Sequence, residues 1–121
     1  MAKILRLEIH SDNRGSLVSY EKFLPFDVNR TYVIYNINGK ERGGHRHKVC
    51  WQALVVLQGS CVVKCNNGLI REKFLMDSPN KVLILKPEDW HKISDFKNNV
   101  ILMVLASHHY DANDYIYEDY K

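Results

Sequence analysis

Two histidines one residue apart, His45 and His47, are the clearest candidates for acid–base chemistry in this sequence. They follow Gly43-Gly44, and on an extended segment the side chains of residues i and i+2 point to the same face. If that face lines the interior of a barrel, both imidazoles enter one pocket. Imidazole has an ordinary pKa of about 6.5 and can accept or donate a proton near neutral pH. The segment therefore predicts a site of general acid–base catalysis.

The spacing around these histidines matches the first cupin motif. Four residues separate His47 from Gln52, and six more separate Gln52 from Gly59. Gln52 thus stands where a metal-binding cupin has its glutamate, and a neutral amide is a poor ligand for a hard metal compared with a carboxylate. An incomplete second motif follows, in which Pro87 and His91 are present and the usual glycine is missing. Together the motifs predict a cupin barrel without a bound metal.

The rest of the chain supplies strands to frame such a pocket. Apolar and polar residues alternate with a period of two, and turn signals such as Asn38-Gly39 recur about every ten residues, which is typical of an all-β sandwich or barrel. We expect a turn at Gln58-Gly59-Ser60 and a short helical turn in the tail, residues 108–121. The fold class predicted is all-β, with residues 1–121 forming a single-domain cupin jelly-roll barrel. The expected strands are residues 4–9, 15–20, 30–37, 51–57, 61–65, 69–75, 82–85, 91–93 and 100–105.

The composition argues against several classes of protein. The chain has 17 Lys and Arg against 14 Asp and Glu, without the concentrated basic patch of a nucleic-acid-binding protein. Its longest uncharged run, residues 49–63, is shorter than the roughly 20 residues of a membrane-spanning helix, and we see no apolar signal segment. The three cysteines lie in apolar surroundings, which is typical of a reducing compartment. We expect a cytoplasmic protein with no nucleic-acid or membrane partner.

Beyond the cupin motifs, the sequence resembles the nucleotide-sugar 3,4-ketoisomerases, a family that includes the dTDP-4-keto-6-deoxyglucose isomerases. Tyr117 and Trp51 depart from the family pattern, which often has arginine at the first position and a charged residue at the second. The elements that carry the resemblance occur in order along nearly the whole chain, at residues 13–17, 25–26, 30–32, 42–48, 58–61, 90–91, 105–107 and 110–116.

The resemblance implies a cupin that needs no metal or other cofactor and acts on a dTDP-linked 4-keto-6-deoxy sugar. Such an enzyme removes the C3 proton, forms an enediolate and delivers a proton to C4, so the carbonyl moves from C4 to C3. The 3-keto product is then available for transamination in the biosynthesis of unusual deoxysugars, such as those of lipopolysaccharide O-antigens. The resemblance also implies a homodimer that exchanges N-terminal strands, with residues 4–9 as the donated element.

On this basis further residues receive expected roles. Tyr32, on the strand before the histidines, is expected to hydrogen-bond the developing enediolate oxygen, so the predicted catalytic residues are His45, His47 and Tyr32. Arg42 and Lys48 are expected to bind the diphosphate. Other residues are expected to bind the sugar or to orient a catalytic group. These remaining substrate-binding candidates are Arg14, Arg30, Gln52, Trp90 and His91.

Other interpretations stay open at this point. A metal-dependent cupin oxygenase would use His45, His47 and His91 as three neutral ligands. A nucleotide-sugar epimerase would use a similar base but return the carbonyl to C4, and a non-catalytic sugar-binding cupin would need the histidines only as lining. Ordinary structural roles also compete, such as strand packing for Tyr32 and a solvated surface charge for Lys48. Metal content, turnover of the keto sugar and product identity distinguish these interpretations.

Overall fold

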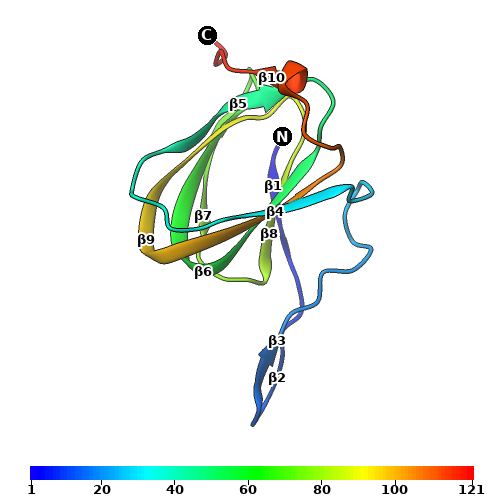
Figure 1. The fold of residues 1–121 in the computed structure, drawn as a ribbon, viewed down its shortest axis with the longest axis vertical. Coiled ribbons are helices and arrows are strands. Elements are labelled where there is room, and N and C mark those ends of the chain that lie inside the picture. The colour runs from blue at the N-terminus through cyan, green and yellow to red at the C-terminus, as the bar shows by residue number, and fades with distance from the viewer.

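The strands of the computed structural model, which describes residues 1–121, wrap into a barrel (Figure 1). Most belong to one sheet in the order β1-β8-β6-β9-β5-β10, with β4 paired to β9 and β7 paired to β6. The all-β prediction is confirmed, and no helix is long and apolar enough to span a membrane. The strands are β1 (Lys3–Arg6), β2 (His10–Asp12), β3 (Gly15–Leu17), β4 (Arg30–Ile34), β5 (Arg42–His47), β6 (Gln52–Asn66), β7 (Arg71–Met76), β8 (Lys81–Leu85), β9 (Trp90–Ala106) and β10 (Tyr115–Ile116).

Two long strands, β6 and β9, replace pairs of short strands that the sequence predicted. β6 runs without a break through Gln58-Gly59-Ser60, and β9 joins residues 91–93 to residues 100–105. The two strands pair antiparallel, with shifts of register between Val56 and Val62. The predicted turn was wrong because Gly59, with a φ of +75°, lies in an irregular part of the ladder that bends the strand without ending it.

Gly59 is a position where we expect substitution to be costly. A Cβ atom there would lie 2.4 Å from the carbonyl oxygen of Lys97 and 2.8 Å from that of Asn98. Because clash and backbone strain add, we expect Gly59→Ala to lower the free energy of unfolding by about 2–4 kcal/mol. Gly39→Ala is the matched control: its φ is +88° but nothing lies within 4 Å, so only a strain of about 1 kcal/mol is expected. Urea unfolding of both variants tests this, and equal losses would contradict it.

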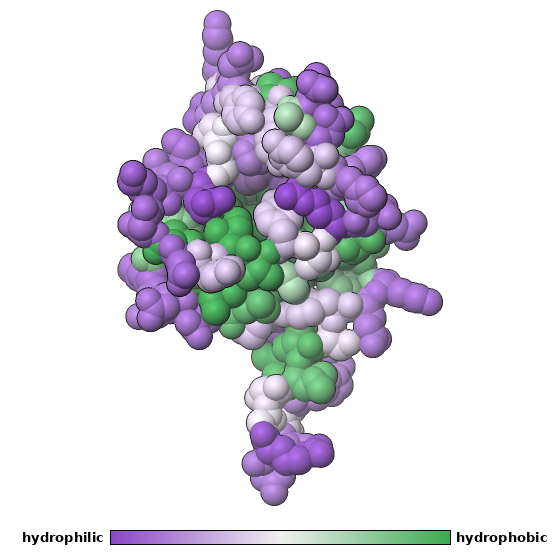
Figure 2. Space-filling view, viewed as in Figure 1, coloured by the Kyte–Doolittle hydropathy of each residue, from purple (hydrophilic) through white to green (hydrophobic).

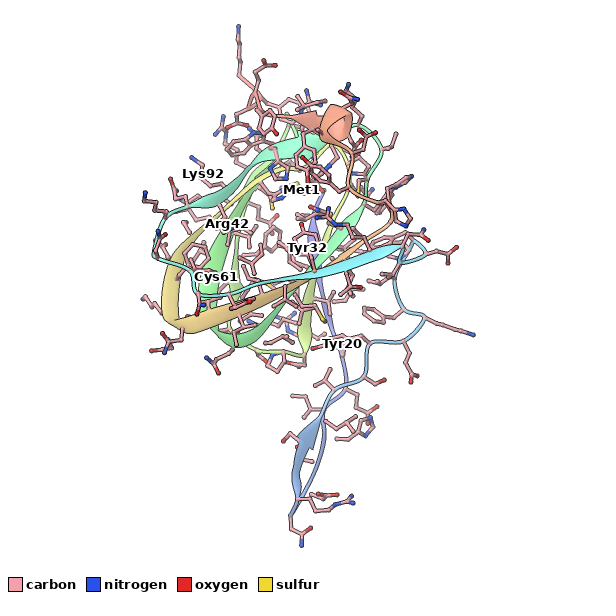
Figure 3. All side chains as sticks on the ribbon, viewed as in Figure 1. Met1, Tyr20, Tyr32, Arg42, Cys61 and Lys92 are labelled. Atoms are coloured by element: carbon pink, nitrogen blue, oxygen red, sulfur yellow. The ribbon has the colours of Figure 1, made fainter.

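The sheet is buried on both faces in its centre. Leu54 and Leu83 face the larger, inner apolar cluster, whereas Val55 and Val82 face a second cluster on the other side. This two-sided burial follows from the alternation of side chains along a strand and explains the continuous apolar runs in β6 and β8. The second cluster is covered by residues 20–26, which begin with Tyr20 (Figure 3), whose hydroxyl donates to the carbonyl oxygen of Pro79.

The β2–β3 hairpin stands away from the barrel as a projecting arm (Figures 1 and 2). It forms its own two-stranded sheet, and two apolar side chains at its base, Ile9 and Leu17, are 48% and 59% exposed. The predicted strand 4–9 is therefore divided. Its first part, β1, pairs with β8 of the same chain, with Lys3 opposite Ile84, whereas the following residues lead into the arm.

Candidate active site

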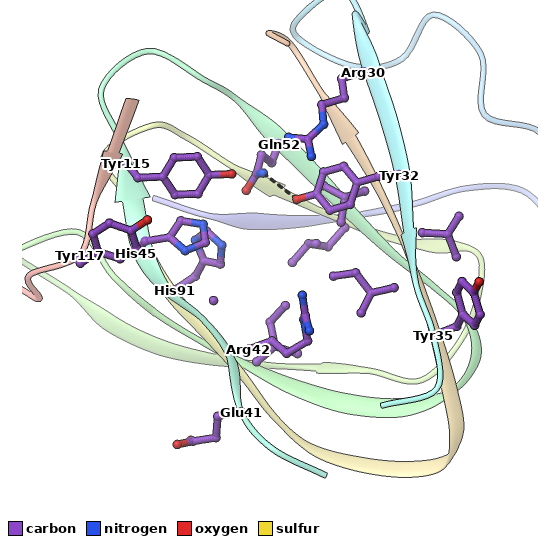
Figure 4. Close-up of a pocket in the computed structure, with 16 residues that line it drawn as sticks. Arg30, Tyr32, Tyr35, Glu41, Arg42, His45, Gln52, His91, Tyr115 and Tyr117 are labelled. Carbon is purple, nitrogen blue, oxygen red and sulfur yellow. Dashed lines mark hydrogen bonds between the residues drawn. The ribbon is translucent and has the colours of Figure 1, made fainter. Parts of the chain in front are cut away.

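A cavity of about 600 Å³ opens between strands β4, β5, β6 and β9 (Figure 4). Its floor is made by Leu54, Ile93 and Val104 of the inner apolar cluster. Its polar wall contains six of the ten residues that the sequence predicted for catalysis or substrate binding. These are Arg30, Tyr32, Arg42, His45, Gln52 and His91.

Strand β5 brings His45 to this cavity, with His47 beside it, because Gly43 lets the strand approach β9 closely. Gly43 and Gly44 have φ values of +80° and +77°, and a Cβ at Gly43 would lie 2.9 Å from the carbonyl oxygen of His91. His45 is opposite His91 in the β5–β9 register, and their ring centroids are 4.8 Å apart. The ring of His47 lies 5.0 Å from that of His45. Three imidazoles therefore form one cluster.

Two of these imidazoles are neutral at neutral pH. Burial and, to a smaller extent, the neighbouring His47 together lower the pKa of His45 to about 4. Burial lowers the pKa of His91 to about 3. Nδ1 of His91 lies 3.2 Å from the carbonyl oxygen of Asp89, so Nδ1 carries the proton and donates, and Nε2 keeps a lone pair. A neutral imidazole is the form that can accept a proton from a substrate.

His47 is held in a buried pair with Asp114. Nδ1 of His47 lies 2.8 Å from Oδ2 of Asp114, and the side chains are only 4% and 8% exposed. Oδ1 of Asp114 accepts hydrogen bonds from the backbone N–H groups of Lys48 and Val49, at 3.1 and 2.8 Å. Burial acts to raise the pKa of Asp114, but the bonds from Val49 and His47 outweigh it and the pKa is lowered.

The ionised Asp114 fixes the tautomer of His47. An acceptor-only carboxylate requires the proton on Nδ1, which leaves Nε2 as the basic nitrogen. Nε2 of His47 is buried and makes no hydrogen bond of ordinary geometry within the protein. Burial lowers the pKa of His47, while Asp114 and the side chain of Gln52 act to raise it. His47 lies directly behind the cavity wall, with its ring 4.6 Å from that of Tyr115.

Tyr32 presents its hydroxyl to the cavity with its proton available. Nε2 of Gln52 donates to the hydroxyl oxygen of Tyr32 at 3.2 Å, as the dashed line in Figure 4 shows. The O–H of Tyr32 is therefore free to donate to another group. Burial raises the pKa of Tyr32, so the phenol stays protonated. The guanidinium of Arg30 lies 4.2 Å from the centre of the Tyr32 ring and places positive charge at the same wall.

Three predicted substrate-binding residues lie elsewhere in the chain. Arg14 is at the tip of the arm and is ion-paired with Asp12. Lys48 is exposed and contributes only its backbone N–H near the site. Trp90 lines a neighbouring groove, and its indole N–H donates to the carbonyl oxygen of Tyr117 at 3.0 Å. Within a single chain, none of these three residues lines the histidine pocket, and their roles in substrate binding stay predictions.

The tail contributes residues that the sequence analysis assigned to no site. A 3₁₀ turn, η1 (Ala112–Asp114), confirms the expected helical turn and places Asp114 against His47. Strand β10 then pairs with β5, with Tyr115 opposite His47. Tyr115 and Tyr117 both line the cavity. Residues 110–116 carry part of the family resemblance, but no periodicity in the tail predicts that a two-residue strand joins β5.

Comparison with known proteins adds independent findings. The family model described as FdtA, WxcM-like, C-terminal, matches residues 1–121. A TDP-4-oxo-6-deoxy-alpha-D-glucose-3,4-oxoisomerase from Aneurinibacillus thermoaerophilus is 42% identical over 124 residues, which cover 98% of this chain and 89% of that protein.

Solved structures show the same similarity. The TDP-quinovose 3,4-ketoisomerase from Campylobacter jejuni has a TM-score of 0.91 and 38% identity, covering 97% of this chain and 92% of the other. A 3,4-ketoisomerase from Thermoanaerobacterium thermosaccharolyticum was solved as a histidine-to-asparagine mutant in complex with TDP-4-keto-6-deoxyglucose. Its TM-score is 0.91 at 30% identity, covering 97% of this chain and 87% of the other.

Proposed function

This chain belongs to the FdtA, WxcM-like family, and from that premise we propose that it is a sugar 3,4-ketoisomerase that converts a dTDP-linked 4-keto-6-deoxyhexose to its 3-keto isomer. The 42% identity with a 3,4-oxoisomerase over 98% of the chain carries this proposal. The cavity adds the chemistry, because neutral imidazoles and a protonated phenol are the groups that an enediolate mechanism needs.

The reaction uses the histidine pair as base and acid. A neutral imidazole removes the C3 proton, and the electron pair of the broken C3–H bond forms the C3–C4 double bond of the enediolate. Tyr32 stabilises the developing oxygen charge with its free O–H, while the resulting imidazolium supplies the proton that C4 receives. His45 presents its ring to the cavity, and His47 contacts His45 and keeps Nε2 free for a proton. Positioned groups of this kind contribute about 10²–10⁴-fold each.

The substrate is anionic, and the cavity offers matching cations. Arg30 and Arg42 line it from β4 and β5, and guanidinium groups suit the paired oxygens of a diphosphate. The volume of about 600 Å³ accommodates a hexose with part of its nucleotide. We assign the diphosphate to these arginines and the keto sugar to the histidine wall.

The site residues favour chemistry without a metal. A metal-dependent cupin would add a carboxylate ligand at position 52 to the nitrogens of the three histidines, but this chain has Gln52 there, and its amide donates to Tyr32. Gln52 offers no carboxylate for a fourth ligand. The metal-dependent oxygenase is therefore the alternative that the chelator experiment below tests.

The quaternary structure forms part of the proposal. We propose a homodimer with exchanged N-terminal strands. Within one chain β1 pairs with β8, so the support for the exchange comes from the arm, which carries exposed Ile9 and Leu17 and projects from its own barrel. Such an exchange would allow Arg14, at the tip of the arm, to contact a ligand bound by the partner subunit. We propose that the enzyme is cytoplasmic, and its three free, buried cysteines support this. We also propose that its product is used in deoxysugar biosynthesis, such as that of O-antigens.

The experiment that tests this function is turnover of TDP-4-keto-6-deoxyglucose in D₂O, followed by NMR. We expect the 3-keto isomer, with deuterium at C4 at least in part and in a single configuration, because a positioned donor protonates one face and its proton exchanges with solvent. Activity should persist after exhaustive dialysis against a chelator. A product that keeps the carbonyl at C4 with inverted stereochemistry would indicate an epimerase. Loss of activity on removal of metal would indicate an oxygenase-type site. An unchanged sugar would overturn the proposal.

A further inference from the structure

A buried group of three potential metal ligands lies behind the cavity wall. His47, Cys50 and Asp114 are all buried, none of them lines the cavity, and one ligand atom from each lies within 4.8 Å of the other two. We propose that these three residues form an inhibitory site for Zn²⁺, in which the bound ion prevents His47 from acting as a base. The inhibition rests on the ketoisomerase function proposed above, whereas the binding of the ion does not.

The spacing of the ligand atoms suits a tetrahedral ion. Zinc binds nitrogen and oxygen at about 2.0–2.2 Å and thiolate sulfur at about 2.3 Å, so the ligand atoms of a tetrahedral site are about 3.3–3.6 Å apart. Nδ1 of His47 and Oδ2 of Asp114 are 2.8 Å apart, and an opening of about 0.5 Å brings them to this spacing. Because Oδ1 of Asp114 accepts from the backbone N–H groups of Lys48 and Val49, Oδ2 is the oxygen available to the ion.

The types of ligand favour zinc over the hard cations. A nitrogen, a sulfur and a carboxylate oxygen form a mixed set of the kind that zinc takes in proteins, whereas Mg²⁺ and Ca²⁺ prefer oxygen alone. The charges also balance, because the thiolate of Cys50 and the carboxylate of Asp114 together offset the two positive charges of the ion. A neutral group of this kind avoids the cost of burying an unpaired charge. The site is distinct from a cupin metal centre, since it uses neither His45 nor His91.

A second groove gives the ion a way to this site. Ser107 and Asp114 line a groove of about 530 Å³ that also carries the exposed His108 and His109. Oγ of Ser107 lies 3.8 Å from Sγ of Cys50 and 2.7 Å from Nδ1 of His108. These contacts connect the thiol to the mouth of the groove. An ion that enters here reaches its three ligands without passing through the catalytic cavity, and water from the groove completes its coordination.

Binding inactivates His47 by changing its tautomer. In the free protein the proton is on Nδ1 and the lone pair is on Nε2. When Nδ1 binds the ion, the ring stays neutral and carries its proton on Nε2, while Cys50 gives its thiol proton to solvent. One proton is released for each ion bound, and no electron is transferred. Nε2 then has no lone pair for the C3 proton, so the ion lowers kcat without occupying the place of the substrate.

The binding test compares Cys50→Ala with Cys61→Ala, a matched removal of a buried thiol that belongs to the inner apolar cluster. Protein stripped with a chelator is titrated with Co²⁺ and with Zn²⁺. We expect the wild type and Cys61→Ala to bind one ion per chain and to show a thiolate-to-cobalt charge-transfer band in the near ultraviolet. Cys50→Ala should lack this band and bind Zn²⁺ at least about 100-fold more weakly, because it loses a direct ligand and not merely an outer-shell partner.

The kinetic test measures isomerisation of TDP-4-keto-6-deoxyglucose with and without Zn²⁺. At saturating Zn²⁺ we expect kcat of the wild type and of Cys61→Ala to fall by at least about 10²-fold, the effect of losing a positioned base. KM should not change, and a chelator should restore the rate. Cys50→Ala should turn over normally without metal and keep its rate at the same concentration of Zn²⁺.

The outcomes separate this inference from the function on which it rests. If the wild type forms no 3-keto product, the proposed function fails, and the cobalt spectrum still tests the site. Absence of the band in the wild type, or its presence in Cys50→Ala, would overturn the site. Inhibition that raises KM, or that is equally strong in Cys50→Ala, would place the ion in the catalytic cavity and also overturn it. If Zn²⁺ binds through Cys50 and leaves kcat unchanged, the inhibitory role is wrong.

Discussion

His45→Asn and His47→Asn should each lose at least about 10²-fold in kcat on TDP-4-keto-6-deoxyglucose. Asparagine keeps a polar side chain but has no basic nitrogen, so it cannot take the C3 proton or return one to C4. The rings of His45 and His47 are 5.0 Å apart in one cluster, and we expect loss at either position because the pair shares the proton. Single-turnover kinetics with NMR detection of the 3-keto sugar measures the effect.

The control for these variants is His109→Asn. His109 is exposed, lies outside the cavity and belongs to the same tail that carries Asp114. We expect it to keep wild-type kcat and KM. Near-normal rates in folded, purified His45→Asn and His47→Asn would contradict the catalytic assignment of the pair and favour a sugar-binding cupin instead.

The part of this site that the sequence predicts depends on local geometry. The i, i+2 spacing of His45 and His47 on an extended segment is enough to place both on one face, and the same rule joins Arg30 to Tyr32. The cupin spacing then brings Gln52 and His91 to the same cavity. These relations need only the strand period and a known order of strands.

The part that the sequence does not predict depends on long-range pairing. No local pattern in the tail predicts that Tyr115 and Ile116 pair with β5. None predicts that Asp114 bonds to His47, sixty-seven residues earlier in the chain. In the same way, Gly59 reads as a turn because a local pattern cannot distinguish a hairpin from a bend inside a long strand. In both cases the structure depends on pairing with a strand that lies far away in the sequence.

Asp114→Asn should reduce kcat by about 10²–10⁴-fold although it preserves the size and shape of the side chain. The backbone N–H groups of Lys48 and Val49 both donate to Oδ1 of Asp114. The asparagine oxygen will stay with these two donors, so its NH₂ group will face Nδ1 of His47. Nδ1 must then accept, which moves the imidazole proton to Nε2, the nitrogen that the reaction needs as a base.

The pH dependence distinguishes this loss of tautomer from a simple loss of charge. Asp114 acts to raise the pKa of His47 against the effect of burial, so its removal lowers that pKa further and shifts any acid limb due to His47 to lower pH. The ring is then already neutral at neutral pH, and raising the pH should not restore the rate. Asp111→Asn is the control, because asparagine also caps η1, where Asp111 accepts from the backbone N–H of Asn113. Recovery of Asp114→Asn toward the wild-type rate in mildly alkaline buffer, or an equal loss in Asp111→Asn, would show that Asp114 does not act by fixing the histidine tautomer.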